Sequence, residues 1–92
     1  LSAAAHAGAS GRDLVTAYVI GVEAAARIAS VAKSGFHQVG FHPTGIVGVF
    51  GATLAAGRLM GLNVRAVAMG QGIAVSMASG SLEFVEDGAW NK

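Results

Sequence analysis

Small and apolar residues recur every three to four positions in the first third of the chain, which is the period of a helix with one buried face. A weak capping box stands at the start of this pattern, where Ser10 is followed three residues later by Asp13. Gly35 is a residue type that commonly ends helices. The pattern predicts a helix over residues 11–34, and its buried face comprises Leu14, Ala17, Tyr18, Gly21, Val22, Ala25, Ile28, Ala29 and Ala32.

A second helix is expected after a loop over residues 35–43. Pro43 disfavours helical backbone at the residue before it, so the helix should begin just after this proline. Thr44 is a good N-cap residue, and Gly61 is a good stop at the other end.

Asn63 is expected to cap a third helix that runs to about Ser79, where Gly80 ends it. This helix is apolar nearly all round, and such a helix must be enclosed on all sides. A short further turn is expected over residues 82–85. The chain as a whole is predicted to be all-α, with three to four packed helices and no second domain within residues 1–92.

Glycine and alanine are placed along one side of the second helix, at Gly48, Gly51 and Ala55. A glycine inside a helix costs about 0.5–1 kcal/mol relative to alanine, and a sequence tolerates this cost where another backbone must approach closely. We therefore expect tight helix packing, including packing against partners outside this chain.

The composition narrows the class of protein. Hydrophobic residues make up 53% and charged residues 12% of the chain, with a net charge of +1, which excludes a disordered charged tail and argues against a nucleic-acid-binding module. Because the chain has few charged residues, its exterior must be largely apolar. We therefore expect a piece of a larger protein or an obligate oligomer. The absence of cysteine excludes disulfides and thiolate metal sites, and it fits the reducing cytoplasm, where we expect the protein to be found.

No membrane partner is expected. The two apolar runs, residues 44–57 and 66–82, are shorter than the roughly 18 residues needed to span a bilayer, and Arg58 and Arg65 interrupt the stretch between them. The N-terminus lacks the pattern of a signal peptide.

Few side chains can support chemistry, and the histidines His6, His37 and His42 are the ones that ordinarily titrate near neutrality. Their spacing does not match a metal site, no carboxylate lies near them in sequence, and no phosphate-binding glycine motif is present. We therefore expect no metal site and no phosphate-binding loop. The pair Glu23–Arg27 and the polar residues Gln71 and Ser76 are interpreted as structural, as are Tyr18 and Trp90.

The segment Gly40-Phe41-His42-Pro43-Thr44-Gly45 is the strongest candidate site. A helix N-terminus exposes free N–H groups that favour an anion, and a glycine in its first turn allows close approach. His42 would stand beside such an anion and could exchange a proton with it. A histidine at this place also often only satisfies a buried carbonyl, and the residues alone leave both roles open.

These residues also carry a family resemblance. The segment 40–45, with the glycines, alanines and Arg58-Leu59 that follow to Leu62, resembles the central motif of the MmgE/PrpD family. Gly21-Val22-Glu23 with Arg27 resembles the helix upstream of that motif. The downstream segment of the family is matched by Ala78-Ser79-Gly80, Leu82-Glu83-Phe84, Gly88 and Lys92.

The resemblance implies that the chain is part of a large all-helical domain, an incomplete enzyme whose smaller α/β lid domain is absent here. His42 matches the family's active-site histidine, and Lys92 matches a lysine that lines the same pocket. Thr44 and Gly45 are then expected to bind substrate. The acidic and histidine residues that the family places upstream, and a histidine after the lysine, are missing.

The resemblance further implies a metal-independent lyase that moves a proton next to a carboxylate of a small di- or tricarboxylic acid, without cofactor. A 2-methylcitrate dehydratase-like activity is expected, in a homodimer that needs the rest of its own polypeptide. A cis-aconitate decarboxylase and an iminodisuccinate epimerase of the same family are the alternatives. The competing class is a non-catalytic helical unit for packing or oligomerisation, and the isolated 92 residues are expected to be inactive.

Overall fold

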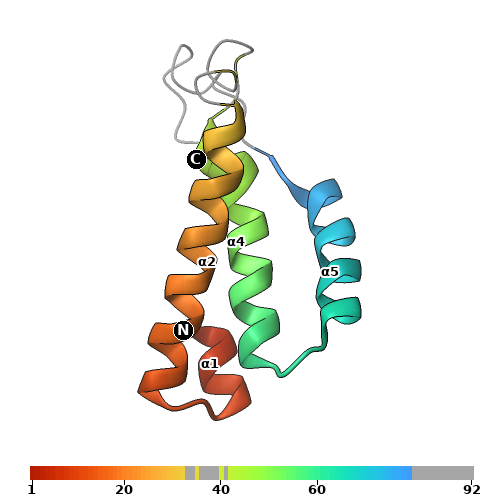
Figure 1. The fold of residues 1–92 in the computed structure, drawn as a ribbon. Helices are drawn as coiled ribbons and strands as arrows, with labels where there is room; N and C mark the ends of the chain where they lie inside the picture. Colours follow the sequence, from red (N-terminus) through yellow and green to blue (C-terminus); the bar gives the residue numbers. More distant parts are fainter. Residues whose placement is uncertain (33–34, 36–39, 41, 80–92) are drawn as a thin grey trace.

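The computed structural model describes residues 1–32, 35, 40 and 42–79, and these are all-α. Four helices are present, and no strand occurs among the described residues (Figure 1). They are α1 (Ser2–Ala7), α2 (Gly11–Ala32), α4 (Pro43–Leu59) and α5 (Val64–Met77). The predicted fold class is thereby confirmed, with α1 as an addition that the alanine-rich start of the sequence did not reveal.

The predicted capping box begins α2. The amide of Asp13 donates to Ser10 Oγ at 3.1 Å, and the amide of Ser10 donates to Asp13 Oδ2 at 3.4 Å. These two bonds satisfy backbone donors that the first turn of a helix otherwise leaves open. The described helix ends at Ala32, and the remainder of the predicted helix, residues 33–34, lies outside the described residues.

The link between α4 and α5 is built from two local signals, and both were predicted. Gly61 takes a left-handed conformation with φ of 69°, which glycine adopts without steric cost. The amide of Gly61 donates to the Arg58 carbonyl and that of Leu62 to the Gly57 carbonyl, which is the Schellman pattern. Asn63 then caps α5, its side-chain oxygen accepting from the Ala66 amide at 2.8 Å.

α5 ends at Met77, two residues before the predicted end, and Ala78 is already extended. The predicted stop at residue 80 and the predicted turn over residues 82–85 lie outside the described residues.

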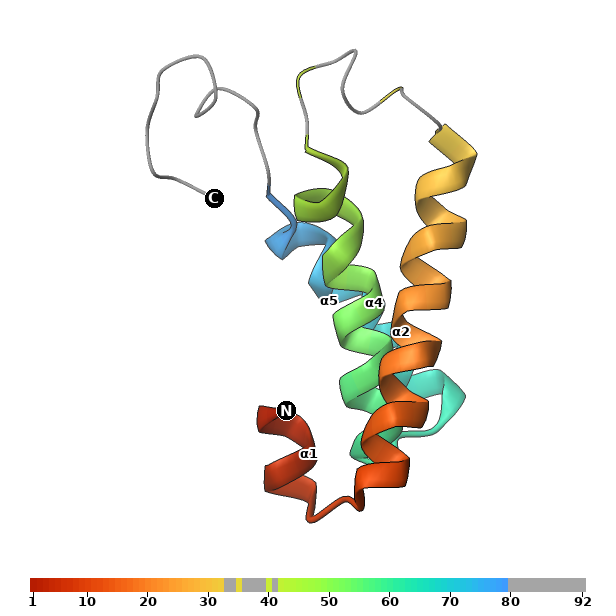
Figure 2. The ribbon, with the colours of Figure 1, turned by 90° about the vertical axis from the view of Figure 1, so that its left-hand side faces the viewer.

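α4 is the central helix of the described fold. α2 packs along one side of it, α5 along another, and α1 folds back against its C-terminal end (Figures 1 and 2). α2 and α5 have no comparable contact with each other. The position of α4 is thus set from several sides, whereas the outer helices are each held mainly by α4.

The crossing of α2 and α4 depends on two glycines. A Cβ atom added at Gly51 would lie 2.5 Å from the Gly21 carbonyl oxygen, and one added at Gly21 would lie 2.8 Å from the Gly51 oxygen. Both distances are shorter than real Cβ atoms show. The close approach predicted for Gly51 is therefore confirmed, and its partner is α2. A close approach was also predicted for Gly48, but no described atom lies within 4 Å of a Cβ added there.

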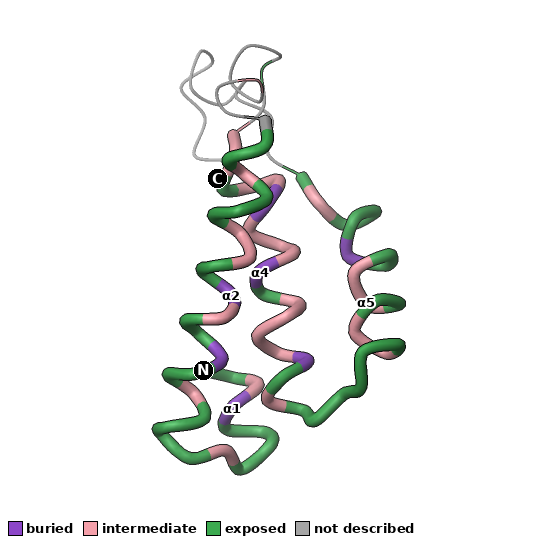
Figure 3. The backbone as a smooth tube through the Cα atoms, viewed as in Figure 1, coloured by how far each residue is buried: buried purple, intermediate pink, exposed green. Residues whose placement is uncertain are grey.

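The interior is small. The buried hydrophobic residues of the described part are Ala4, Ala17, Val47 and Ala74, and no large side chain there is fully buried (Figure 3). Large apolar side chains remain exposed on the outer helices, with Tyr18 at 68% and Met77 at 73%. The buried face predicted for the first helix is thus only partly covered, because Ala17 and Gly21 are buried while Tyr18 and Val22 are exposed.

The described part of the chain does not supply the enclosure predicted for the third helix. α4 covers one side of α5, but Val64, Met69 and Ile73 are 87%, 65% and 64% exposed. A helix needs a neighbour on each apolar side to be enclosed, and α5 has one principal neighbour among the described helices.

One stretch is long and apolar enough to cross a membrane. Within residues 11–31 of α2, an 18-residue window has a mean hydropathy of 1.5, and 11% of that window is buried. A single such helix is weak evidence for a membrane segment, because helices in the cores of soluble proteins pass the same test. The stretch also carries Glu23 and Arg27, and ionised side chains are costly at bilayer depth.

Candidate functional site

His42 is the N-cap of α4, the residue immediately before the helix. Its backbone is extended, with φ of −84° and ψ of 117°, and Pro43 occupies the first turn of the helix. The proline imposes both features, because it disfavours helical backbone before it and presets its own φ for the helix. The N-cap is therefore His42, and the prediction of Thr44 in that role is wrong: Thr44 already lies inside the first turn.

The first turn of α4 is open toward the side of His42. The His42 carbonyl accepts from the amides of Gly45 at 3.1 Å and Ile46 at 3.2 Å, and Pro43 has no N–H. No described residue accepts from the Thr44 amide, and no side-chain cap is present. Among the described residues, the amide and the hydroxyl of Thr44 have no hydrogen-bond partner, and donors at a helix N-terminus favour an anion.

The imidazole of His42 is neither enclosed in an apolar interior nor used as a cap. His42 is half-buried, Gly45 is half-buried and Thr44 is exposed. The bonds that begin the helix are made by the backbone carbonyl of His42, so the ring is not needed for them. Among the described residues, none forms a hydrogen bond with the ring.

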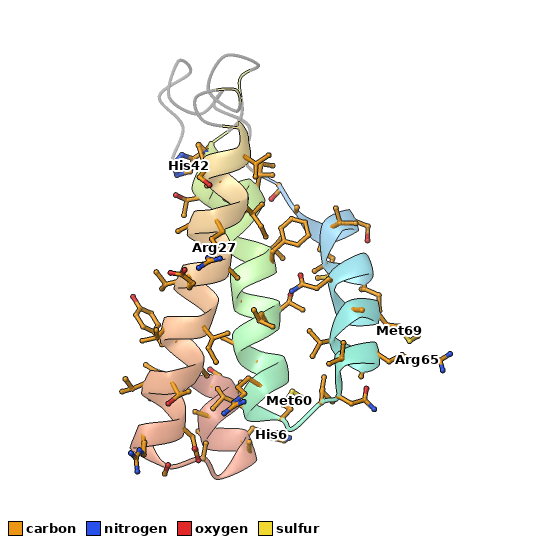
Figure 4. All side chains as sticks on the ribbon, viewed as in Figure 1. His6, Arg27, His42, Met60, Arg65 and Met69 are labelled. Atoms are coloured by element: carbon orange, nitrogen blue, oxygen red, sulfur yellow. The ribbon has the colours of Figure 1, made fainter. Side chains whose placement is uncertain are left out.

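The other histidine that the structure describes lies far from this position. His6 is exposed in the last turn of α1, and Figure 4 shows it at the opposite end of the bundle from His42. His37 and Lys92 lie outside the described residues. Among the residues that the structure describes, no three histidines or carboxylates are grouped in a way that could hold a metal ion.

The polar residues interpreted as structural do have structural partners. Arg27 Nε donates to Glu23 Oε1 at 2.6 Å in an exposed pair one helical turn apart. Gln71 Nε2 donates to the Phe50 carbonyl at 3.1 Å and so joins α5 to α4, whereas Ser76 bonds the carbonyl of Ile73 in its own helix. Trp90 lies outside the described residues, and Tyr18 is exposed.

Two hollows were not foreseen. One, of about 320 Å³, is apolar and lies between α2 and α4, where Tyr18, Val22 and Gly48 contribute to its lining. The other, of about 290 Å³, is polar and lies at the α1–α2 turn, where Asp13 and Arg58 contribute to its lining. The second depends on α1 folding back against α4, a long-range contact that no local pattern in the sequence signals.

Comparison with protein families gives one clear result. The model of the MmgE/PrpD N-terminal domain matches residues 1–92, the whole of the chain. Neither the curated proteins nor the solved structures yielded a match. The matched range includes the segment around His42 and all four described helices. By this match over its entire length, the chain belongs to the MmgE/PrpD family.

Proposed function

We propose that the whole protein is a metal-independent lyase that acts on a small tricarboxylate, in the manner of a 2-methylcitrate dehydratase. Members of the MmgE/PrpD family are in general lyases, which supports the reaction class. The observation that carries the proposal is the position of His42, a half-buried imidazole next to an open helix N-terminus.

In the proposed reaction, the imidazole of His42 takes a proton from the carbon next to a substrate carboxylate. The electron pair of that C–H bond forms the new C=C bond. The protonated imidazole gives its proton to the hydroxyl group on the neighbouring carbon, and the C–O bond breaks to release water. Charge accumulates on the carboxylate as the C–H bond breaks, and hydrogen-bond donors aimed at it lower the barrier. Imidazole suits this step because it exchanges protons near neutral pH.

The carboxylate is assigned to the open turn of α4. The Thr44 amide and hydroxyl are donors there, the positive end of the helix dipole adds to their attraction, and Gly45 leaves room for close approach. Lys92 is proposed as a second group that holds an anion, on the family resemblance. No organic cofactor is invoked, since proton transfer and the loss of water require none.

Decarboxylation of cis-aconitate and epimerisation of iminodisuccinate use the same residues, because both also place negative charge beside a carboxylate. These two activities of the family are therefore the alternatives for the same site. The proposal also places the protein in the cytoplasm as a homodimer, without nucleic-acid or membrane partners.

The experiment replaces His42 with alanine in the whole protein and measures turnover of 2-methylcitrate and of cis-aconitate. General acid–base catalysis contributes about 10²–10⁴-fold to a rate, so we expect a loss of that size. The melting temperature should change little, because the ring makes none of the bonds that begin α4. Wild-type turnover in the His42→Ala variant would remove His42 from the mechanism.

His6→Ala is the matched control, since it removes the same kind of side chain from an exposed position at the other end of the bundle. We expect this variant to keep full turnover. A comparable loss in both variants would point to a general effect of losing histidine and would contradict the assignment.

A second candidate function is a helical unit that only packs or oligomerises. The observation in its favour is the glycine-to-glycine contact of α2 with α4, together with the exposed apolar faces of the outer helices. Assaying the isolated 92 residues beside the whole protein separates the two candidates. Turnover confined to the whole protein supports the lyase, and its absence from both supports the packing unit.

A further inference from the structure

We draw no further inference here: the strongest candidate, the open apolar hollow between α2 and α4 that Tyr18, Val22 and Gly48 help to line, carries nothing because no observation in the described part of the chain shows what covers it.

Discussion

Replacing Gly51 with alanine tests how α2 and α4 are held together. The added methyl group would lie 2.5 Å from the Gly21 carbonyl oxygen and 3.1 Å from Ala25 Cβ. Ordinary contact for a Cβ atom begins at 3.4 Å, so the helices must separate by about 0.9 Å at this point. The obstacle on the other side is backbone, which cannot rotate out of the way as a flexible side chain does.

Two opposing terms decide the size of the effect. Overpacking of this kind costs about 1–3 kcal/mol, and the separation also weakens the dispersion contacts around the crossing. Alanine in place of glycine returns about 0.5–1 kcal/mol through its better helix propensity. We therefore expect Gly51→Ala to lower the free energy of unfolding by about 0.5–2 kcal/mol, with a fall of several degrees in Tm.

Gly72→Ala in α5 is the control, because nothing lies within 4 Å of the added Cβ there. In this variant the better helix propensity of alanine acts without a clash, so the free energy of unfolding should rise by about 0.5–1 kcal/mol. Thermal and urea unfolding of the whole protein, followed by circular dichroism, measures both variants. The reasoning is refuted if Gly51→Ala stabilises the protein as much as Gly72→Ala does.

Three further expectations can be checked separately. Asn63→Ala should cost about 1 kcal/mol in unfolding experiments because the bond from the Ala66 amide is lost, whereas Asn63→Asp keeps an acceptor and should cost much less. The isolated 92 residues should self-associate in sedimentation, since large apolar side chains on α2 and α5 are exposed; a monodisperse 9.1 kDa monomer would contradict this. Turnover of the whole protein should survive treatment with EDTA, and its loss would restore a metal-dependent mechanism.

The helix ends were predictable from the sequence where a local signal decides them. Ser10 and Asp13 stand three residues apart, and Asn63 bonds an amide three residues ahead, so each signal is complete within one turn. The start of α4 was predicted two residues late because Thr44 was given more weight than Pro43. Proline in the first turn has no amide to satisfy, and the extended residue before it is already in the conformation of an N-cap.

Contacts between segments that are distant in the sequence were harder to predict from the sequence. The small side of α4 could be located from the spacing of its glycines, but the identity of its neighbour could not. A Cβ added at Gly51 would meet Gly21 of α2, whereas one added at Gly48, three residues earlier, would have no described atom within 4 Å. Helix α1 was missed for a related reason, since it is short and contacts α4, with Ala4 as its buried residue. Such contacts depend on how the helices are arranged, which a period in the sequence does not specify.

For the candidate site, the sequence could predict only the arrangement of neighbouring residues. The sequence indicated a histidine beside a helix N-terminus, and the structure places His42 there, with Thr44 and Gly45 in the first turn. Whether Lys92 approaches His42 depends on residues outside those the structure describes. The chemistry of the segment could be proposed from residue types, whereas the assembly of a complete pocket depends on tertiary contacts.

α4 both positions the candidate site and holds the fold together. His42 is its N-cap, and the other described helices pack against it. Gly51 lies eight residues after Pro43, about 12 Å along the helix axis at 1.5 Å per residue. A displacement of α4 at the α2–α4 crossing would therefore be expected to shift its N-cap as well. Misplacing a reacting group by about 1 Å can cost about 10²-fold in rate. If His42 is the base of the proposed reaction, a change at the glycines of the crossing would lower turnover through the position of the imidazole.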